Sequence, residues 1–267
     1  MSKPKSNLKW SLNKSTVKLV QSLKQQKYRK EHQLFVVEGR KMVEELLQSH
    51  LETLCLFATE RFLLDYELQD ERLEVATEVQ MAQMSGLDTP PGILAVASIP
   101  EQRLALPLTE PMTLVLDGIA NPGNLGTIIR TAEWFGIKQI VCSEDCVELW
   151  NPKVIQATMG SIFRMSIAYT DLESLLKDLK QEGKSVYGAL LEGENLFRME
   201  RWTEGAVVIG SESHGIRKHL LPYITQPITI PRAAGSLTES LNASMATGII
   251  LSSWASKRYF CLSLHKP

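Results

Sequence analysis

The spacing of apolar residues along this chain changes between the period of helices and that of strands. In the first hundred residues, helical spacing covers residues 15–30, 40–50 and 78–86, whereas apolar runs of strand type cover 34–39, 51–59 and 93–98. A linker punctuated by Pro100, Pro107 and Pro111 follows these segments. The pattern predicts a small α/β domain over residues 1–106.

The second half alternates strands and helices more regularly. Apolar runs of strand type lie at 112–119, 138–143, 163–169, 185–191 and 206–212, and segments of helical period lie between them at 124–136, 151–160 and 171–183. Such alternation is typical of a mostly parallel sheet that helices cover on both faces. We therefore predict a second α/β domain over residues 107–267, whose ligands bind beyond the carboxyl ends of its strands.

The stretch from Ile228 to Trp254 combines an apolar run, a loop and a helix. The run ends at Pro231, a loop of small residues follows, and a long apolar segment begins near Ser240, which we expect to cap a helix. Small residues such as Gly248 on this helix allow another backbone to approach closely. The segment is either an ordinary core helix or a surface for a ligand, a neighbouring loop or a second subunit.

Composition describes an ordinary globular protein. Hydrophobic residues make up 44% of the chain and charged residues 22%, and no apolar run approaches the roughly 20 residues of a membrane span. The basic N-terminus lacks the apolar core of a secretory signal. The four cysteines are scattered, and Cys142 and Cys146 lack the second Cys/His pair of a zinc site. We expect no bound metal and a reducing, cytoplasmic compartment.

The net charge of −1 conceals a strongly basic beginning. The first thirty residues carry nine Lys or Arg and no acidic residue, which leaves 20 basic against 30 acidic residues in the remainder. A concentrated basic end on an acidic protein suits contact with the phosphates of nucleic acid. A solubilising tail has the same composition, so charge alone leaves both interpretations open.

Polar side chains gather where three predicted strands end. They are Asn124 and Arg130 after the run at 112–119, Glu212 at the end of the run at 206–212, and Ser240 and Asn242 after the run at Ile228. The set offers hydrogen-bonding groups and one fixed cation, without an evident pair of nucleophile and base. It suits the orientation of a hydroxyl group and the binding of a phosphate better than covalent or metal chemistry.

Each of these signals also has an ordinary structural explanation. An arginine in an apolar helix commonly extends to solvent, as Arg130 can, and the glycines around Glu212 suit a plain turn. Neither N-P-G-N-L-G nor G-S-E-S-H-G matches the glycine patterns of dinucleotide or P-loop sites. A nicotinamide-dependent oxidoreductase therefore fits the α/β pattern but lacks the glycines of its fingerprint.

Three ordered motifs together resemble a known family. They are N-x-G-N-L-G-x-x-x-R-T-A from Asn121, I-G-S-E-x-x-G from Ile209, and I-P followed by S-L-N-x-S-x-A-x-G-I from Ile230. This order resembles the three motifs of the SpoU (TrmH-like) branch of the SPOUT RNA methyltransferases, over Met112 to about Trp254. The amino-terminal V-E-G-R-K-M-V-E-E-L-L also looks like the family's small substrate-binding domain of ribosomal-protein-like fold.

The resemblance implies a fold, a reaction and a set of residues. It implies a SPOUT-type parallel sheet with a C-terminal trefoil knot, a homodimer packed near the knot, S-adenosylmethionine as methyl donor, and a 2′-O-methylated ribose in RNA as product. The catalytic and substrate-orienting residues would be Asn124, Arg130, Glu212, Ser240 and Asn242. The cofactor contacts would be Leu190, Glu192, Gly193, Gly210, Ile230, Pro231 and Leu241. The basic residues expected to contact RNA are Lys14, Lys18, Arg29, Lys30 and Arg40.

Some features stay open within the resemblance. The loop from Pro231 to Ser240 is longer than is typical of the family, so the conformation of Arg232–Glu239 does not follow from it. The family's counterpart of Arg130 is commonly assigned as general base, yet a guanidinium stays protonated in proteins. We expect Arg130 to bind phosphate and stabilise a developing alkoxide instead, while Ser240 and Asn242 orient the hydroxyl.

Several alternatives share this fold. Ribosomal RNA is favoured as substrate over transfer RNA, because the chain has a separate predicted RNA-binding domain. An enzyme of antibiotic resistance would perform the same chemistry on a different nucleotide. A catalytically silent RNA-binding member is the remaining alternative, and the presence of all five candidate residues argues against it.

Overall fold

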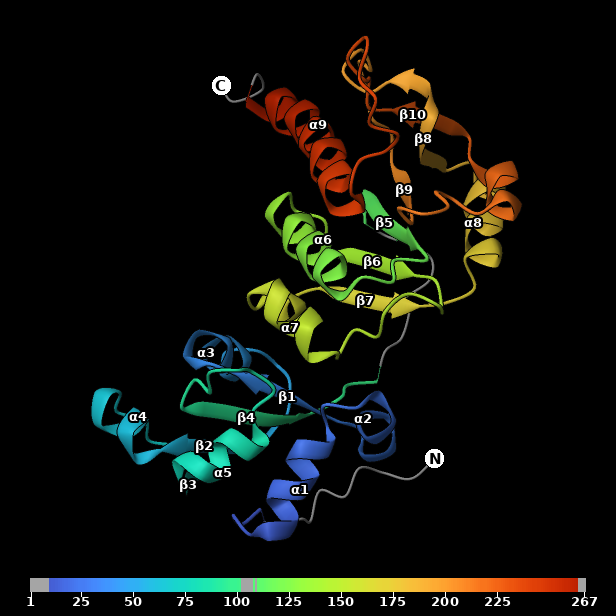
Figure 1. Cartoon of the computed structure of the whole chain (residues 1–267). Helices are drawn as coiled ribbons and strands as arrows, with labels where there is room; N and C mark the ends of the chain where they lie inside the picture. The colour runs from blue at the N-terminus through green and yellow to red at the C-terminus, as the bar shows by residue number, and fades with distance from the viewer. Residues whose placement is uncertain (1–9, 102–107, 109, 264–267) are drawn as a thin grey trace. The chain divides into compact units, whose positions relative to one another are not determined.

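The computed structural model describes residues 10–101, 108 and 110–263, and the chain forms two compact units (Figure 1). The first unit comprises Met1–Glu101 and Glu148–Arg164, and the second comprises Gln102–Val147 and Met165–Pro267. The segment Glu148–Arg164, which the sequence places within the second domain, therefore clusters with the first unit. The boundary predicted between residues 106 and 107 lies outside the described residues.

The first unit is built on a four-stranded sheet with the order β1-β4-β2-β3, in which β4 is antiparallel to both β1 and β2. Its strands are β1 (Leu34–Glu38), β2 (Thr53–Thr59), β3 (Leu73–Ala76) and β4 (Ile93–Ser98). Its helices are α1 (Lys14–Ser22), α2 (Gln26–His32), α3 (Arg40–Leu47), α4 (Glu60–Asp65), α5 (Glu78–Met84), α7 (Pro152–Thr158) and the 3-10 helix η1 (Ser161–Phe163).

Strand β1 is buried along its whole length because other elements pack on both of its faces. Alternate residues of a strand point to opposite sides of a sheet. Val36 belongs to a buried cluster with Val20 of α1 and Met81 of α5. The ring of Phe35, on the opposite side, lies 4.3 Å from that of Trp150, so the segment Glu148–Arg164 contributes to this core.

Residues 15–30 form two helices, so our prediction of one continuous helix is wrong. The chain turns after α1, and the guanidinium of Arg29 donates to the backbone carbonyls of Leu23 (2.7 Å) and Lys24 (2.8 Å). In a continuous helix these carbonyls would accept bonds from N–H groups four residues later. Arg29 replaces those bonds and stabilises the break.

The second unit contains a six-stranded sheet with the order β10-β8-β9-β5-β6-β7, and every neighbouring pair is parallel. This confirms the predicted parallel α/β domain. Its strands are β5 (Met112–Asp117), β6 (Gln139–Cys142), β7 (Ser166–Tyr169), β8 (Ser185–Asn195), β9 (Gly205–Gly210) and β10 (Gln226–Thr229). Its helices are α6 (Pro122–Trp134), α8 (Leu172–Gln181), the 3-10 helix η2 (Lys218–Tyr223) and α9 (Ala243–Ser263).

Helices cover both faces of this sheet. Leucines of α8 and η2 join Val115 of β5 and Val141 of β6 in one buried cluster, while α6 and α9 lie along the other face (Figure 1). The small side of α9 meets α6, since a Cβ at Gly248 would lie 3.8 Å from Cγ2 of Thr131. Within the residues that the structure describes, no helix has the length and apolarity to span a membrane.

Candidate active site

The carboxyl ends of β5 and β9 lie side by side, because these strands pair in parallel with Asp117 opposite Gly210. The segment after β5 enters α6 through Asn121, whose side chain accepts hydrogen bonds from the backbone N–H groups of Gly123 (2.8 Å) and Asn124 (3.2 Å). This cap, with a proline in the first turn, begins α6 and holds Asn124 at its amino-terminal end.

Asn124, Glu212 and Asn242 form one hydrogen-bonded group, although they lie far apart in the sequence. The carboxylate of Glu212 accepts hydrogen bonds from Nδ2 of Asn124, from Nδ2 of Asn242 (3.3 Å) and from the backbone N–H of Ala243 (3.4 Å). Nδ2 of Asn242 also donates to Oδ1 of Asn124 at 3.0 Å. The structure thus joins the three polar strand ends through a single carboxylate.

Asn242 caps α9, so our prediction of Ser240 as the cap is wrong. Oδ1 of Asn242 accepts hydrogen bonds from the backbone N–H groups of Ser244 (3.0 Å) and Met245 (3.3 Å). An asparagine can accept from the helix with its oxygen while its NH₂ group donates to two further acceptors, whereas a serine hydroxyl has a single proton to donate. Ser240 is exposed, and its hydroxyl makes no hydrogen bond to any residue that the structure describes.

Arg130 lies outside the Asn124–Glu212–Asn242 group. Six residues of an α-helix separate it from Asn124, so the two side chains point about 120° apart around the axis of α6. Arg130 is exposed and forms neither a hydrogen bond nor an ion pair with the described part of the chain. Its guanidinium is available to a ligand, but the structure does not bring it together with the other candidates.

A buried carboxylate fixes the loop that carries Glu212. Asp117 has no exposed side-chain surface, and it accepts hydrogen bonds from the backbone N–H (2.8 Å) and Nε (2.5 Å) of Arg217. The loop between Gly210 and Arg217 folds back so closely that a Cβ on Gly210 would lie 2.0 Å from the carbonyl carbon of Gly215. We did not predict this pair; the available signal is an acidic residue that ends a fully buried, mostly apolar strand.

Polar groups after β6 support the same loop. A hydrogen bond from Ser143 lowers the pKa of Asp145, and Arg217, 3.4 Å away, adds to the shift. Hydrogen bonding with Cys142 lowers the pKa of Cys146 to about 7 although burial opposes the change.

Across the residues that the structure describes, no group of His, Cys, Asp and Glu could hold a metal ion.

The predicted cofactor residues surround an irregularity of β8. Its pairing with β10 jumps from Gly188–Pro227 to Glu194–Ile228, so Ala189–Gly193 have no register partner in the described strands. We call Ala189–Gly193 the β8 bulge. It contains Leu190, Glu192 and Gly193, and its residue Leu191 accepts a hydrogen bond from Oγ1 of Thr229 (3.0 Å).

The remaining predicted cofactor residues are Gly210, the last residue of β9, and Ile230, Pro231 and Leu241, which follow β10. Leu190 and Ile230 are partly buried, whereas Pro231 and Leu241 are exposed. Packing of the chain against itself explains the two glycines, because a Cβ on Gly193 would lie 2.7 Å from the carbonyl carbon of Pro227 and Gly210 is crowded in the same way. The loop Arg232–Glu239 is exposed except at the partly buried Ser236, and it closes on itself, with Nη1 of Arg232 donating to the carbonyl of Thr238 at 3.0 Å.

Four of the five basic residues predicted to contact RNA, Lys14, Lys18, Lys30 and Arg40, are exposed on the first unit. Arg29 is only 2% exposed, and Nε lies 3.1 Å from the carboxylate oxygens of Glu148. The prediction for Arg29 is wrong, because its donors point into the protein and satisfy buried acceptors. The basic residues Lys3, Lys5 and Lys9 lie outside the described residues.

Two family models match the chain. The model of the SpoU rRNA Methylase family matches residues 111–252, and the model of the MRM3-like substrate binding domain matches residues 14–95. The first match covers the part of the chain that carries the three motifs, and the second covers the part that begins with the basic segment.

Relatives and solved structures agree with these models. The chain is 30% identical over 251 residues to the 23S rRNA (guanosine(2553)-2'-O)-methyltransferase RlmP of Bacillus subtilis, covering 90% of this chain and 96% of that protein. A putative RNA methyltransferase of the TrmH family from Porphyromonas gingivalis has a TM-score of 0.82 and 34% identity, with coverage of 92% and 98%.

An AdoMet-bound rRNA methyltransferase from Sinorhizobium meliloti has a TM-score of 0.80 and 27% identity, with coverage of 93% of this chain and 96% of that chain. These similarities confirm the resemblance seen in the three motifs and extend it over both units. The SpoU model spans more than half of the chain, and the Bacillus subtilis relative is similar over nine-tenths of it, so this protein belongs to the SpoU rRNA methylase family.

Proposed function

We propose that this enzyme transfers a methyl group from S-adenosylmethionine to a ribose 2′-oxygen of ribosomal RNA. The observation that carries the proposal is the Asn124–Glu212–Asn242 group, which joins the three family motifs at the carboxyl edge of a parallel sheet. The names of the Bacillus subtilis and Sinorhizobium meliloti relatives specify rRNA, and the latter structure is AdoMet-bound.

The β8 bulge and the segment from Ile230 to Leu241 would hold the cofactor. S-adenosylmethionine supplies an electrophilic methyl group when it is bound. The backbone groups of the bulge, which lack register partners in the described strands, suit the hydrogen-bonding edge of an adenine, and Leu190, Ile230 and Leu241 suit its apolar faces. The donor set of the site therefore fits this ligand.

Two candidate residues keep unused polar groups for the RNA. The hydroxyl of Ser240 and the guanidinium of Arg130 have no partner in the described part of the chain, whereas the polar atoms of Asn242 are occupied by Asn124, Glu212 and α9. We therefore assign the orientation of the hydroxyl to Ser240, and phosphate binding with alkoxide stabilisation to Arg130. Positioning of this kind can supply roughly 7–11 kcal/mol of a barrier.

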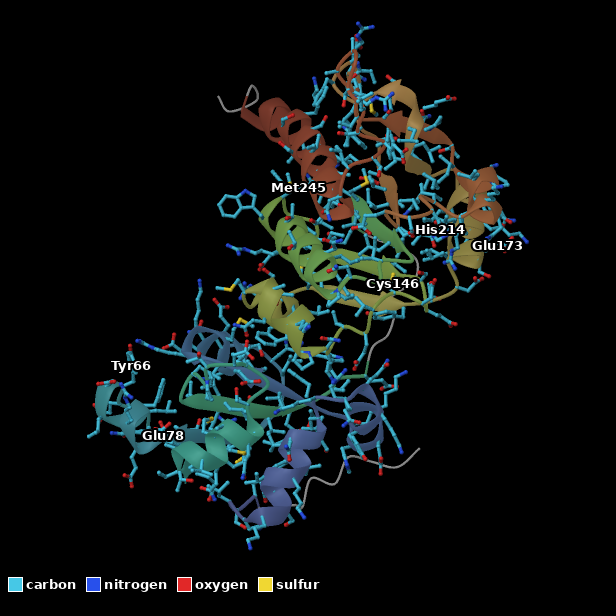
Figure 2. All side chains as sticks on the ribbon, viewed as in Figure 1. Tyr66, Glu78, Cys146, Glu173, His214 and Met245 are labelled. Atoms are coloured by element: carbon cyan, nitrogen blue, oxygen red, sulfur yellow. The ribbon has the colours of Figure 1, made fainter. Side chains whose placement is uncertain are left out.

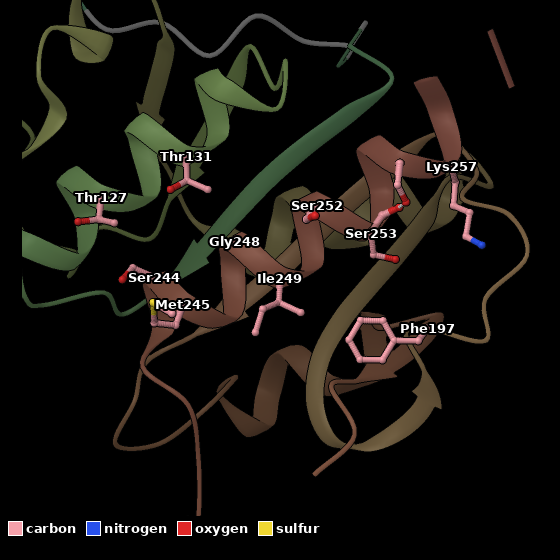
Figure 3. A pocket seen from close by; sticks show the side chains of 11 residues that line it. Thr127, Thr131, Phe197, Ser244, Met245, Gly248, Ile249, Ser252, Ser253 and Lys257 are labelled. Carbon is pink, nitrogen blue, oxygen red and sulfur yellow. Dashed lines mark hydrogen bonds between the residues drawn. The ribbon is translucent and has the colours of Figure 1, made fainter. Parts of the chain in front are cut away.

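The proposal includes a homodimer and the C-terminal trefoil knot. An open pocket of ≈ 650 Å³ lies between α6 and α9, and Figure 3 shows Thr127 on α6, Met245 on α9 and Phe197 around it. Met245 is 61% exposed and Phe197 60% exposed, which is unusual for large apolar side chains that surround a pocket. A second copy of the chain is the occupant we propose.

Oligomeric state tests this part of the proposal. Met245→Glu should convert a dimer into a monomer in light scattering after size exclusion, because it places a charge in the pocket. Leu64→Glu is the matched control, since Leu64 is 87% exposed on the first unit and should leave the mass unchanged. A monomeric wild-type protein would remove the dimer from the proposal.

The buried, free Cys55, Cys142 and Cys146 support a reducing cytoplasm as the compartment.

Labelled methyl transfer tests the proposed reaction. Unmodified ribosomal RNA and transfer RNA are each incubated with enzyme and methyl-labelled S-adenosylmethionine, and the RNA is then hydrolysed with alkali. A 2′-O-methylated ribose cannot attack its phosphate, so label in an alkali-resistant dinucleotide from ribosomal RNA is the expected result. Label only from transfer RNA would assign the alternative substrate, and no label with either RNA would favour a catalytically silent member of the family.

A further inference from the structure

An aromatic pair lies on the short helix α2 of the first unit. The rings of Tyr28 and His32, one helical turn apart, have centroids 6.4 Å apart and an interplanar angle of 12°. Tyr28 is partly buried and His32 is exposed, so His32 is the outer ring. Nζ of Lys27 lies 5.7 Å from the centroid of Tyr28. Lysine and two nearly parallel rings therefore share one small surface.

The surroundings of this pair are basic. Helices α1 and α2 and the turn between them carry exposed Lys14, Lys18, Lys24, Lys27 and Lys30. Between Trp10 and Val37 the only acidic residue is Glu31. A ring pair in such surroundings attracts a ligand that combines a negative charge with a flat, polarisable group, and a nucleotide has both.

The buried Arg29 holds α2 in place. Its guanidinium is bonded to the carbonyls of Leu23 and Lys24 on one side and to Glu148 on the other. Tyr28 and Lys30 are its immediate neighbours in the sequence. The helix is thereby fixed before any ligand arrives, which lowers the entropy cost of binding.

A second pair of cation and aromatic ring provides a comparison. The guanidinium of Arg40 lies 4.0 Å from the ring centroid of Tyr66, which Figure 2 labels at the outer end of α4. Glu44 accepts a hydrogen bond from Nε of Arg40 at 2.7 Å, and Glu60, Asp65 and Glu67 stand close by in the sequence. These carboxylates repel phosphate, so the closer of the two pairs is the less suited to RNA.

We propose that Tyr28 and His32 form a stacking platform for an unpaired nucleobase of the RNA substrate, while the surrounding lysines contact its phosphates. The proposal rests on the proposed function and adds that the substrate is recognised at a loop, bulge or single strand. A base within a duplex has both faces covered by its neighbours, so it offers no face to the outer ring. Stacking on one ring lowers the dissociation constant by roughly 5- to 150-fold, independently of base identity.

The test compares four variants of the full chain with wild type on two probes. Binding of fluorescent single-stranded oligoadenylate, and of the same strand annealed to oligouridylate, is measured by anisotropy for wild type, His32→Ala, Tyr28→Leu and the matched control Tyr66→Leu. The first two variants should weaken binding of the single strand about tenfold and leave the duplex unaffected. Tyr66→Leu should change neither, and Tyr28→Phe, which keeps the ring, should bind as wild type.

Salt dependence separates stacking from phosphate contact. The slope of log affinity against log salt should stay constant in His32→Ala and fall by about 0.7 for a single strand in Lys27→Gln. Equal losses in His32→Ala and Tyr66→Leu, or equal losses on strand and duplex, would overturn the platform. Methyl transfer by the wild-type enzyme is measured in parallel, so failure of the platform remains distinguishable from failure of the proposed function.

Discussion

Arg29 on α2 and Arg130 on α6 are both arginines that the sequence marks for contact with RNA, yet their surroundings are opposite. Arg29 is buried, and its donors are taken by Glu148 and by two backbone carbonyls. Arg130 is exposed and without a partner among the described residues. A buried guanidinium has to be satisfied from within the protein, whereas an exposed one keeps its donors for a ligand.

The contrast separates a cation that stabilises the fold from a cation that is available for the reaction. The same substitution should therefore affect stability at one position and turnover at the other. Measuring both quantities for both variants tests whether burial and pairing are sufficient to assign the two roles.

Arg29→Ala should give the largest effect. It leaves Glu148 without its cation and two carbonyls without a donor, which should lower the free energy of unfolding by about 3–5 kcal/mol. Urea denaturation followed by fluorescence measures the change. The neighbouring Lys30→Ala is the control and should stay within about 0.5 kcal/mol of wild type. An Arg29→Ala protein of wild-type stability that has lost affinity for RNA would reverse our assignment.

Arg130→Ala should instead lower kcat by about 10²–10³-fold, the usual cost of removing one donor that stabilises developing negative charge. Its thermal midpoint should match that of wild type, because Arg130 forms no hydrogen bond or ion pair with the described residues. Arg130→Lys distinguishes the two possible roles of the side chain. Low activity at every pH would support binding of phosphate and alkoxide, and activity that rises at high pH would indicate a general base.

Asn242 sharpens the comparison because it combines both roles. Asn242→Ala should cost about 1 kcal/mol of stability through loss of the helix cap and should also lower kcat. Asn242→Ser keeps a capping oxygen but lacks the amide that donates to Asn124 and Glu212, so it should retain stability and still lose activity. Parallel changes of stability and activity in both variants would show that the two roles cannot be separated.

Arg72 is intermediate between Arg29 and Arg130, because it is paired with Asp70 but is 37% exposed. Removal of the Asp70 charge should therefore give the smallest effect of these substitutions. Hydrogen bonds from Arg72 lower the pKa of Asp70 below the ordinary value of about 3.9, so the pair stabilises the fold above that pH and the stabilisation disappears as pH falls through the lowered pKa. At neutral pH, the free energy of unfolding of wild type should exceed that of Asp70→Asn by less than about 1 kcal/mol. Urea melts at neutral and acidic pH measure the difference, and a constant gap would contradict the prediction.

Much of the second unit follows from the sequence. The central strands β5, β6 and β9 are mostly apolar and buried, and α6 carries its start signal in Asn121 and Pro122. The approach of Asn124, Glu212 and Asn242 followed from the rule that parallel strands end at one edge. The motif resemblance named these three residues together as members of one catalytic and substrate-orienting set.

The errors have two physical origins: side-chain contacts that no periodic pattern records, and elements too short to show a period. The break between α1 and α2 contains neither Gly nor Pro and depends on Arg29, and the pairing of Asp117 with Arg217 spans a hundred residues. The cap of α9 shifted to Asn242 because that side chain also serves Glu212. Strand β3 has four residues and helix α4 has six, so both are too short to show a period, and they were not predicted.

The inclusion of Glu148–Arg164 in the first unit has a consequence for synthesis on the ribosome. Glu148, the carboxylate partner of Arg29, and Trp150, the ring partner of Phe35, emerge only after β5, α6 and β6 have been translated. At the usual 5–20 residues per second, the first unit waits on the order of several seconds for these partners after Glu101 has been added. A fragment that ends at Glu101 would reproduce this waiting state permanently, with a buried arginine that has no carboxylate.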